Sequence, residues 1–300
     1  MASHSDKPRA LLTGCHGFTG CYVATELGAA GYEVVGLAHD GDPPREGVLR
    51  ANLLDRDAVR RAVTEARADV VVHLAAISFV AHGDADEIYR TNVVGTRNLL
   101  EALASAEMKP RSVVLASSAN IYGNAEVQPI TEATPSAPAN DYAVSKLAME
   151  YMARLWMDRL PITLVRPFNY TGVGQGENFL IPKIVAHFRR GEQVIELGNT
   201  DVARDFSDVR EVARAYAAII AKAPAGETIN ICSGIAHSLG DVLGMMAQIA
   251  GYAIEVRVNP AFVRGNEVKR LVGSNARLQT LAGFVPAAPL DETLRWMYAG

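Results

Sequence analysis

Short apolar runs alternate with helical patterns through the first half of this 300-residue chain, and this alternation constrains its fold more than any other feature. The runs are rich in valine and lie at residues 9–14, 32–38, 69–76, 112–118 and 162–167. The helical patterns lie at 18–31, 55–66, about 84–107 and 141–159. Strands that are apolar throughout are typical of a parallel sheet covered by helices on both faces. The sequence therefore predicts an α/β fold with a doubly wound parallel sheet.

Composition and charge exclude several classes of protein. Hydrophobic residues make up 49% of the chain and charged residues 21%, which is ordinary for a soluble chain with a sizeable core. A net charge of −4 gives no reason to expect nucleic acid or an anionic membrane as partner. The longest apolar stretch, 70–81, is too short to span a bilayer, and the first ten residues do not resemble a signal peptide. Three cysteines without a CxxC pair predict reduced cytoplasmic thiols, and scattered histidines predict no metal site.

A glycine-rich segment, TGCHGFTG (13–20), joins the first predicted strand to the first predicted helix. Its glycines are Gly14, Gly17 and Gly20, in GxxGxxG spacing. Glycine permits positive φ in the turn and lets the backbone approach a pyrophosphate, while the helix N-terminus supplies free N–H donors. A tight turn without a ligand is the alternative. At the first strand–helix junction of an alternating chain, the pattern favours a nucleotide-binding Rossmann fold.

The end of the second predicted strand bears on which nicotinamide cofactor is bound. In such folds an acidic residue at this strand end usually binds the adenosine ribose. Here the strand end falls at Ala38, followed by His39 and Asp40. An alanine leaves room for a 2′-phosphate, although no arginine stands beside it, so NADP(H) is favoured and NAD(H) stays open. Asn52 and Leu53, after the third predicted strand, are expected to contact the adenine; the alternative is an ordinary turn.

The alternation loosens after Arg166, which suggests a second domain. Residues 166–178 are rich in Gly and Asn, as in a loop, and smaller elements follow. We expect residues 1–168 to form an NAD(P)-binding Rossmann domain, to which about 208–231 return. Residues 169–207 and 232–300 would form a smaller C-terminal α/β domain that binds the substrate.

A serine, a tyrosine and a lysine form the candidate catalytic group. Tyr142 and Lys146 are four residues apart on a predicted helix, so both side chains lie on one face. A nearby ammonium stabilises phenolate and lowers the tyrosine pKa, which makes the pair an acid/base. Lys146 could also hold a ribose hydroxyl. Ser118 ends a strand expected to lie beside this helix, and its hydroxyl could orient a substrate oxygen. The alternative is a surface Tyr–Lys pair and a loop serine.

Taken together, these motifs resemble those of the extended short-chain dehydrogenases/reductases, which act on nucleotide-activated sugars. The motifs that occur in the family's order are TGCHGFTG, HLAA (73–76), SSANIYG (117–123), YAVSK (142–146) and RPFN (166–169). The resemblance covers nearly the whole chain. It implies that Ser118, Tyr142 and Lys146 are the catalytic triad. It also implies that Gly14, Gly17, Gly20 and the strand end at Leu74–Ala75 line the cofactor. Together with the interpretation of the residues themselves, the expected cofactor residues are Gly14, Gly17, Phe18, Thr19, Gly20, His39, Asn52, Leu53, Leu74, Ala75, Ala76, Tyr142, Lys146 and Pro167.

Charged residues in the second half resemble the nucleotide-diphosphate clamp of the branch that handles GDP-sugars. They are Lys183, Arg204, Arg264 and Glu267. Arginines suit a diphosphate and a carboxylate suits ribose hydroxyls; a solvated charged surface is the alternative for each. The segments RPFNYTGVGQ, ARDFSDV, NICSG and GSNARL are similar to those of the GDP-4-keto-6-deoxymannose reductases. The other residues expected to bind substrate are Ser78, Ser118, Asn120 and Asn169.

This resemblance implies reduction of the C4 ketone of a GDP-4-keto-6-deoxyhexose, giving a GDP-6-deoxy sugar such as GDP-D-rhamnose. A nucleotide-sugar 4-epimerase with tightly bound NAD is the first alternative. A 4,6-dehydratase needs a base for C5, and the family places a carboxylate at the position of Asn120, where an amide cannot take a proton. A non-enzymatic NADP sensor would not need the intact triad.

The predicted helix at 142–157 is apolar on nearly all sides. One of its faces must cover the sheet, and the remainder would be exposed in a monomer. We therefore expect a homodimer in which this helix and the one near 91–104 pack as a four-helix bundle. Burial under the C-terminal part of the same chain is the alternative.

Overall fold

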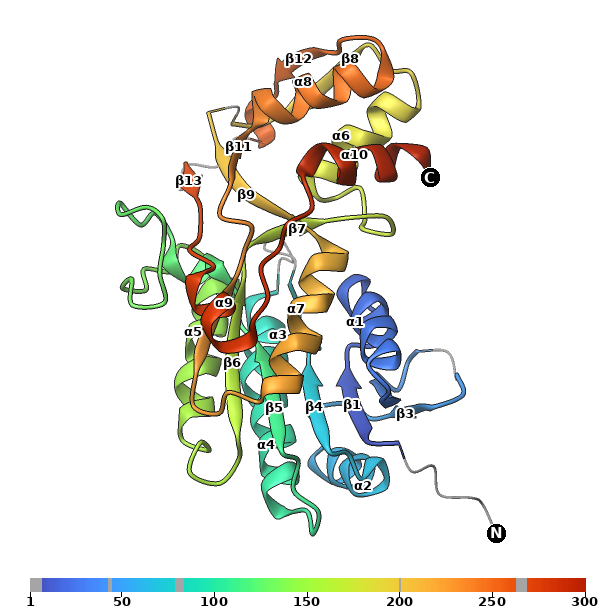
Figure 1. Ribbon diagram of the computed structural model, residues 1–300, viewed down its shortest axis with the longest axis vertical. Coiled ribbons are helices and arrows are strands. Elements are labelled where there is room, and N and C mark those ends of the chain that lie inside the picture. Colours follow the sequence, from blue (N-terminus) through green and yellow to red (C-terminus); the bar gives the residue numbers. More distant parts are fainter. Residues whose placement is uncertain (1–6, 43–44, 79–83, 200, 263–268) are drawn as a thin grey trace.

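The computed structural model describes residues 7–42, 45–78, 84–199, 201–262 and 269–300. Its central sheet has seven parallel strands in the order β10-β6-β5-β4-β1-β2-β3 (Figure 1). These strands are β1 (Arg9–Thr13), β2 (Glu33–Ala38), β3 (Val48–Arg50), β4 (Val70–His73), β5 (Ser112–Ala116), β6 (Ile162–Pro167) and β10 (Thr228–Ile231). Because the order runs outward from β1 in both directions, the predicted doubly wound parallel sheet is confirmed.

Helices cover both faces of this sheet because successive residues of each strand point to opposite sides. Leu11 of β1 belongs to the core under α2 (Arg56–Ala66), α4 (Thr96–Ser105) and α5 (Asp141–Arg154). Its neighbour Leu12 belongs to the core under α1 (Phe18–Ala29), α7 (Val209–Lys222) and α9 (Ala276–Ala282). Figure 1 shows α1 and α7 side by side over this second face. Two buried faces explain why the strands are apolar throughout.

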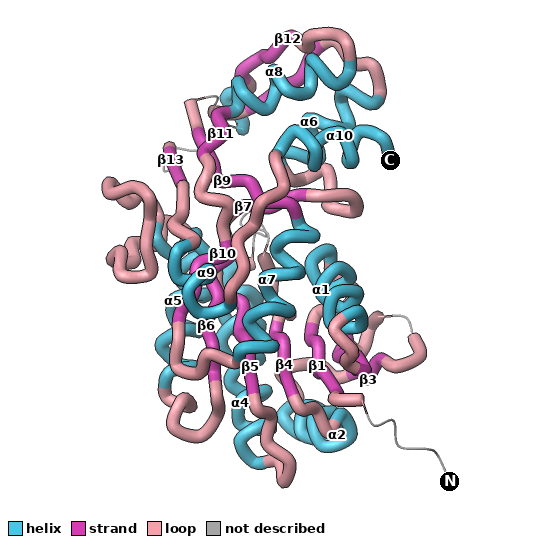
Figure 2. The backbone as a smooth tube through the Cα atoms, viewed as in Figure 1, coloured by secondary structure: helices cyan, strands magenta, loops and turns pink. Residues whose placement is uncertain are grey.

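The remaining elements form a smaller α/β part beyond the carboxyl ends of the central strands (Figures 1 and 2). One sheet contains β7 (Asn169–Thr171), β9 (Ala203–Asp208), β11 (Ala236–Ser238) and β13 (Arg270–Leu271), and β8 (Val194–Leu197) pairs with β12 (Glu255–Val258). A third core involves α6 (Leu180–Arg189), α8 (Leu239–Ala250) and α10 (Leu290–Ala299), and a 3-10 turn spans Pro260–Phe262. Within the described residues, no helix is long and apolar enough to cross a membrane. The assignment of cofactor and substrate to separate domains stays a prediction.

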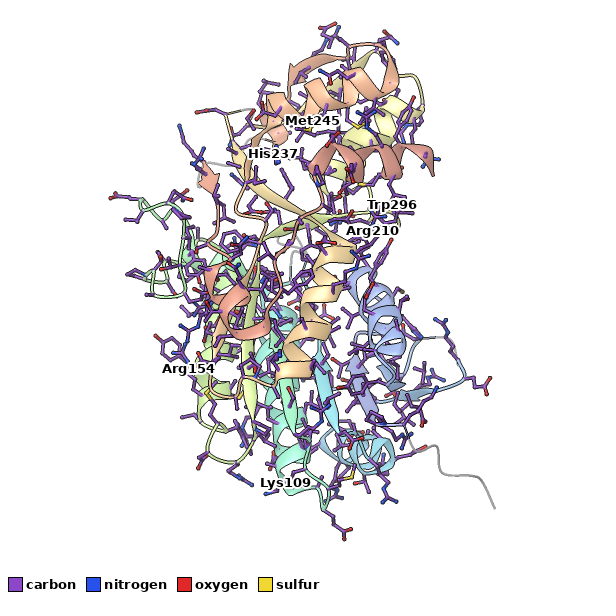
Figure 3. All side chains as sticks on the ribbon, in the orientation of Figure 1. Lys109, Arg154, Arg210, His237, Met245 and Trp296 are labelled. Atoms are coloured by element: carbon purple, nitrogen blue, oxygen red, sulfur yellow. The ribbon has the colours of Figure 1, made fainter. Side chains whose placement is uncertain are left out.

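A buried carboxylate joins the two parts where β9 leads into α7. Asp208 caps α7 by accepting the backbone N–H of Arg210 at 2.7 Å, and it accepts the hydroxyl of Thr293 on α10 at 2.9 Å. The Arg210 guanidinium lies 3.9 Å from the ring centroid of Trp296 on α10 (Figure 3). Helix α10 is thereby attached to the N-terminus of a helix of the central sheet.

Two predicted helices differ from the structure in detail. The helix expected near 84–107 consists of α3 (Ala85–Tyr89), a π-helical segment (Arg90–Gly95) and α4. The helix expected at 141–159 ends at Arg154, and tighter turns lead to Pro161. The N–H groups of residues 155–157 each bond to a carbonyl three residues earlier, so the α-helical pattern stops at Arg154 and the segment tightens before Pro161.

Candidate functional site

The glycine-rich turn between β1 and α1 has no space for side chains at its first and third glycines. Gly14 has φ +68°, and a Cβ on Gly20 would lie 2.1 Å from the Gly14 carbonyl oxygen. Gly17 is the N-cap of α1, and no side chain at this position caps the free N–H groups of the helix. The first N–H groups of α1 therefore lie beside a turn whose three glycines carry no Cβ, and this arrangement fits a pyrophosphate.

The first turn of α1 contacts the strand that follows β6. The hydroxyl of Thr19 lies 2.8 Å from the phenol oxygen of Tyr170 on β7. The ring of Phe18 stacks on the ring of Tyr170 with centroids 6.1 Å apart. Sequence reasoning named Phe18 and Thr19 but not Tyr170, because nothing local in the chain shows that β7 returns to α1.

Carboxylates follow the end of β2, yet both are engaged locally. The Asp40 side chain accepts the backbone N–H of Asn52 at 3.2 Å, and the Asp42 side chain accepts that of His39 at 3.1 Å. Leu53 is buried, and its carbonyl accepts the Asn98 side chain at 2.8 Å. The predicted adenine-side residues thus lie in one loop cluster after β2 and β3.

A chain of hydrogen bonds fixes the turn after β4, where Leu74, Ala75 and Ala76 lie. Burial, aided by the charge of Lys146, lowers the pKa of His73 to about 3, so its ring is neutral. Thr96 donates to the Asn92 carbonyl at 2.7 Å, so it accepts from His73 Nε2 at 2.9 Å. Nδ1 of His73 then accepts the Thr13 hydroxyl at 2.7 Å, and Thr13 accepts the Ala75 N–H at 3.1 Å.

The structure brings Ser118, Tyr142 and Lys146 together at the carboxyl end of β5. Asn140 caps α5 by accepting the N–H of Ala143 at 2.9 Å, which places Tyr142 in the first turn. Lys146 lies one turn further on, with its Nζ 6.0 Å from the Tyr142 ring centroid. Ser118 is the N-cap of the 3-10 helix Ala119–Tyr122 and hydrogen-bonds the Tyr142 side chain. All three side chains are buried.

The pKa of Tyr142 moves in the direction opposite to the one predicted from sequence. Burial raises the pKa of Tyr142 to about 12, against the lowering effect of its hydrogen bond with Ser118. Lys146 is not among the groups that shift this pKa, and its Nζ donates to the Ala116 carbonyl at 2.8 Å. Burial also lowers the pKa of Lys146 to about 8, against the opposing charge of Glu150. Tyr142 is therefore a protonated acid, the form that delivers a proton.

The other tyrosine of this region, Tyr122, is part of the core. It is fully buried, donates to Asn230 Oδ1 at 2.8 Å and accepts from Arg166 Nη1 at 2.8 Å. Burial raises the pKa of Tyr122 to about 12. Its hydroxyl is occupied by two structural bonds, so Tyr142 is the tyrosine that can serve a reaction.

The predicted substrate residues fall into two groups. Ser78, Asn120 and Asn169 follow β4, β5 and β6, so they lie at one edge of the central sheet, as does Pro167 at the end of β6. Lys183 and Arg204 belong to the smaller part, where Lys183 donates to the Glu196 carbonyl at 2.7 Å and Arg204 to the carbonyls of residues 203 and 269 at 3.1 Å. Arg264 and Glu267 lie outside the described residues.

Sequence reasoning missed the buried carboxylate of Asp205 on β9. It accepts the N–H and hydroxyl of Ser233 at 2.9 and 2.6 Å, and the N–H groups of Gly234 and Gly273 at 2.8 and 3.4 Å. These partners belong to the segments NICSG and GSNARL. The one sequence clue was an acidic residue inside the short run ARDFSDV, but its partners lie far along the chain.

Comparisons with known proteins show the family to which this chain belongs. A family model described as the NAD dependent epimerase/dehydratase family matches residues 10–232. A GDP-6-deoxy-D-talose 4-dehydrogenase from Aggregatibacter actinomycetemcomitans is 34% identical over 75% of this chain and 77% of its own. A GDP-6-deoxy-D-mannose reductase from Pseudomonas aeruginosa is 33% identical over 96% of this chain and 95% of its own. UDP-glucose 4-epimerases and a dTDP-glucose 4,6-dehydratase are also among the relatives.

Solved structures show the same fold. A crystal structure from Burkholderia cenocepacia J2315, described as a candidate epimerase, is 54% identical, covers 97% of each chain and gives a TM-score of 0.93. The structure of RMD from Pseudomonas aeruginosa complexed with NADPH is 32% identical, covers 97% of this chain and 98% of its own, and gives a TM-score of 0.84.

Proposed function

Because the chain belongs to the NAD dependent epimerase/dehydratase family, as an extended short-chain dehydrogenase/reductase, we propose that it reduces the C4 ketone of a GDP-4-keto-6-deoxyhexose. The product would be a GDP-6-deoxy sugar such as GDP-D-rhamnose. The observation that carries this proposal is the buried group of Ser118, Tyr142 and Lys146, in which the phenol is held in its protonated form. Two of the relatives carry GDP-6-deoxy-sugar names, which supports the substrate class.

The residues of this chain divide the chemistry among them. When bound, the nicotinamide supplies the hydride that C4 receives. Ser118 holds the C4 oxygen, and Tyr142 gives it a proton as the carbonyl double bond opens. Lys146 returns a proton to the phenolate, with solvent as the final source. The turn around Gly14 and Gly20 fits the pyrophosphate of the cofactor, since a Cβ at either position would collide with backbone.

We further propose that NADP(H) is the preferred cofactor. Ala38 at the end of β2 carries no carboxylate, and Asp40 and Asp42 are engaged by backbone N–H groups. The Pseudomonas structure contains NADPH, which supports the same choice. Dissociation constants for NADPH and NADH, measured by cofactor fluorescence, test this preference, and tighter binding of NADH would reverse it.

In this proposal the central sheet, with residues 1–168 and about 208–231, holds the cofactor. Residues 169–207 and 232–300 hold the nucleotide-sugar. Asn120 would bind a sugar hydroxyl through its partly exposed side chain, while its backbone N–H donates to Ser118 at 3.1 Å. Neither Asn120 nor the buried Ala119 beside it can remove a proton from C5.

The decisive experiment supplies GDP-4-keto-6-deoxymannose and follows NADPH absorbance. A reductase consumes one NADPH per sugar, and the product gains two hydrogens by mass spectrometry. A 4-epimerase would show no net NADPH consumption and would retain NAD through purification. GDP-mannose incubated with NADP should keep its mass, and a loss of water would reveal a dehydratase.

A further inference from the structure

Helix α5 carries a fully buried carboxylate one turn beyond Lys146. Glu150 has no exposed surface, and Lys146 is 5% exposed. A spacing of four residues places both side chains on one face of the helix. Burying a carboxylate costs folding free energy unless its charge is paired, so the partners of Glu150 determine what it does beside Lys146.

Glu150 is held in a fixed geometry by Arg166 of β6. Arg166 donates to it through Nε at 2.8 Å and through Nη2 at 2.7 Å, in a bidentate pair. The same guanidinium donates to Tyr122 at 2.8 Å and to the Glu132 carbonyl at 3.2 Å. Since Tyr122 ends the 3-10 helix that Ser118 begins, this network connects the elements that carry Ser118 and Lys146.

The charges around Lys146 leave one anion to balance it. On α5 its neighbours are Glu150 and the protonated phenol of Tyr142, and β4 contributes the neutral ring of His73. Beside Glu150 lie two cations, Arg166 on β6 and Arg154 on α5 at 3.7 Å, and Tyr122 next to Arg166 is an uncharged phenol. Among the described residues, Glu150 is the charged group that raises the pKa of Lys146 against the effect of burial.

We propose that Glu150 is a positioning residue for this site, which keeps Lys146 protonated through its charge while Arg166 fixes its orientation. The inference rests on the proposed function and on the expectation from the sequence that Lys146 also holds a ribose hydroxyl of the cofactor. Removing the carboxylate would favour neutral Lys146, so the lysine would lose its proton at lower pH. A merely structural Glu150 would change affinity or stability without moving this titration.

The test measures the dissociation constants of NADPH and NADH from about pH 7 to about pH 10, without any sugar. In the wild type, cofactor affinity should fall as pH rises through about 8. Lys146→Met should bind weakly at all of these pH values and show no such fall. If the wild type shows no fall either, the role assigned to Lys146 fails, while sugar reduction stays open to its own test.

Glu150→Gln should move the fall to lower pH by on the order of one unit. Glu150→Asp, which keeps the charge, should leave it near the wild-type pH. The double variant Glu150→Gln/Arg166→Gln also removes the Arg166 cation, so the fall in cofactor affinity should move by less than in Glu150→Gln. This double variant provides the test if the single variant does not fold. A fall that stays at the wild-type pH in both Gln variants would overturn the proposal.

Discussion

Tyr122 and Tyr142 lie twenty residues apart and have opposite surroundings. The Tyr122 hydroxyl is tied to Asn230 and Arg166, whereas Tyr142 is hydrogen-bonded to Ser118 beside Lys146. Tyr142→Phe should lower kcat by ~10²–10⁴-fold with cofactor affinity retained, because the ring still packs but cannot give a proton. Tyr122→Phe is the matched control: it should cost about 1–3 kcal/mol of unfolding free energy and keep most activity. More than a tenth of wild-type activity in Tyr142→Phe would exclude this residue as the acid.

Lys146 also makes the stability of the protein depend on pH. Its pKa in the folded chain is about 8, below the ordinary lysine value of ~10.4. Between these values the unfolded chain binds the proton that the folded chain has released, so this residue's contribution to unfolding free energy rises with pH. Lys146→Met should therefore be more stable than wild type near neutral pH, with the difference shrinking toward about pH 10. Urea unfolding at both pH values checks this, and a constant difference would contradict it.

At the level of elements, the sequence was most informative where structure is local. The runs around Leu11, Val71 and Val114 became central strands because each is buried on both faces. Strand β9 was not foreseen, since its sequence ARDFSD is polar and its partners β7, β11 and β13 are distant in the chain. Asp205 and Tyr170 were not predicted either, because their contacts join segments that are far apart in the sequence and that no motif spacing connects. Site residues within one motif were predictable, and those formed by returning strands were not.

Two glycines on α1 give a test of the cofactor turn. A Cβ on Gly20 would lie 2.1 Å from the Gly14 carbonyl oxygen, whereas a Cβ on Gly28 meets nothing within 4 Å. Gly20→Ala should displace the turn, weaken NADPH binding at least tenfold and lower the melting temperature. Gly28→Ala should leave binding unchanged and stabilise by at most about 1 kcal/mol, because alanine favours a helix. Fluorescence titration and thermal unfolding measure both, and equal behaviour of the two variants would contradict the role of this turn.

For the whole molecule, the candidate catalytic group and the smaller part come from different segments that meet at the carboxyl edge of one sheet. The chain leaves this sheet after β6, returns through α7 and β10, and leaves it again before β11. The attachment of α10 to Asp208 and Arg210 holds the two parts together without using any residue of the triad. In the proposed division of roles, residues of the smaller part would set substrate specificity, while the proposed chemistry would stay at the ends of the central strands.

The outer side of α5 supports the predicted homodimer. An apolar stripe along it, in heptad-like spacing, consists of Val144, Ala148, Tyr151 and Leu155. Tyr151 is 62% exposed and Leu155 77%, and Arg154 beside them lies on the outside of the molecule (Figure 3). Met149 instead packs in the chain's own core.

We expect the apolar stripe on α5 to pack on a second copy of the chain. Tyr151→Glu/Leu155→Glu should therefore sediment as a monomer at micromolar concentration, because a dimer would have to bury the new carboxylates. Val127→Glu is the matched control, since Val127 is 72% exposed and lies in a loop outside α5, and this variant should stay dimeric. A wild-type chain that sediments as a monomer would overturn this arrangement.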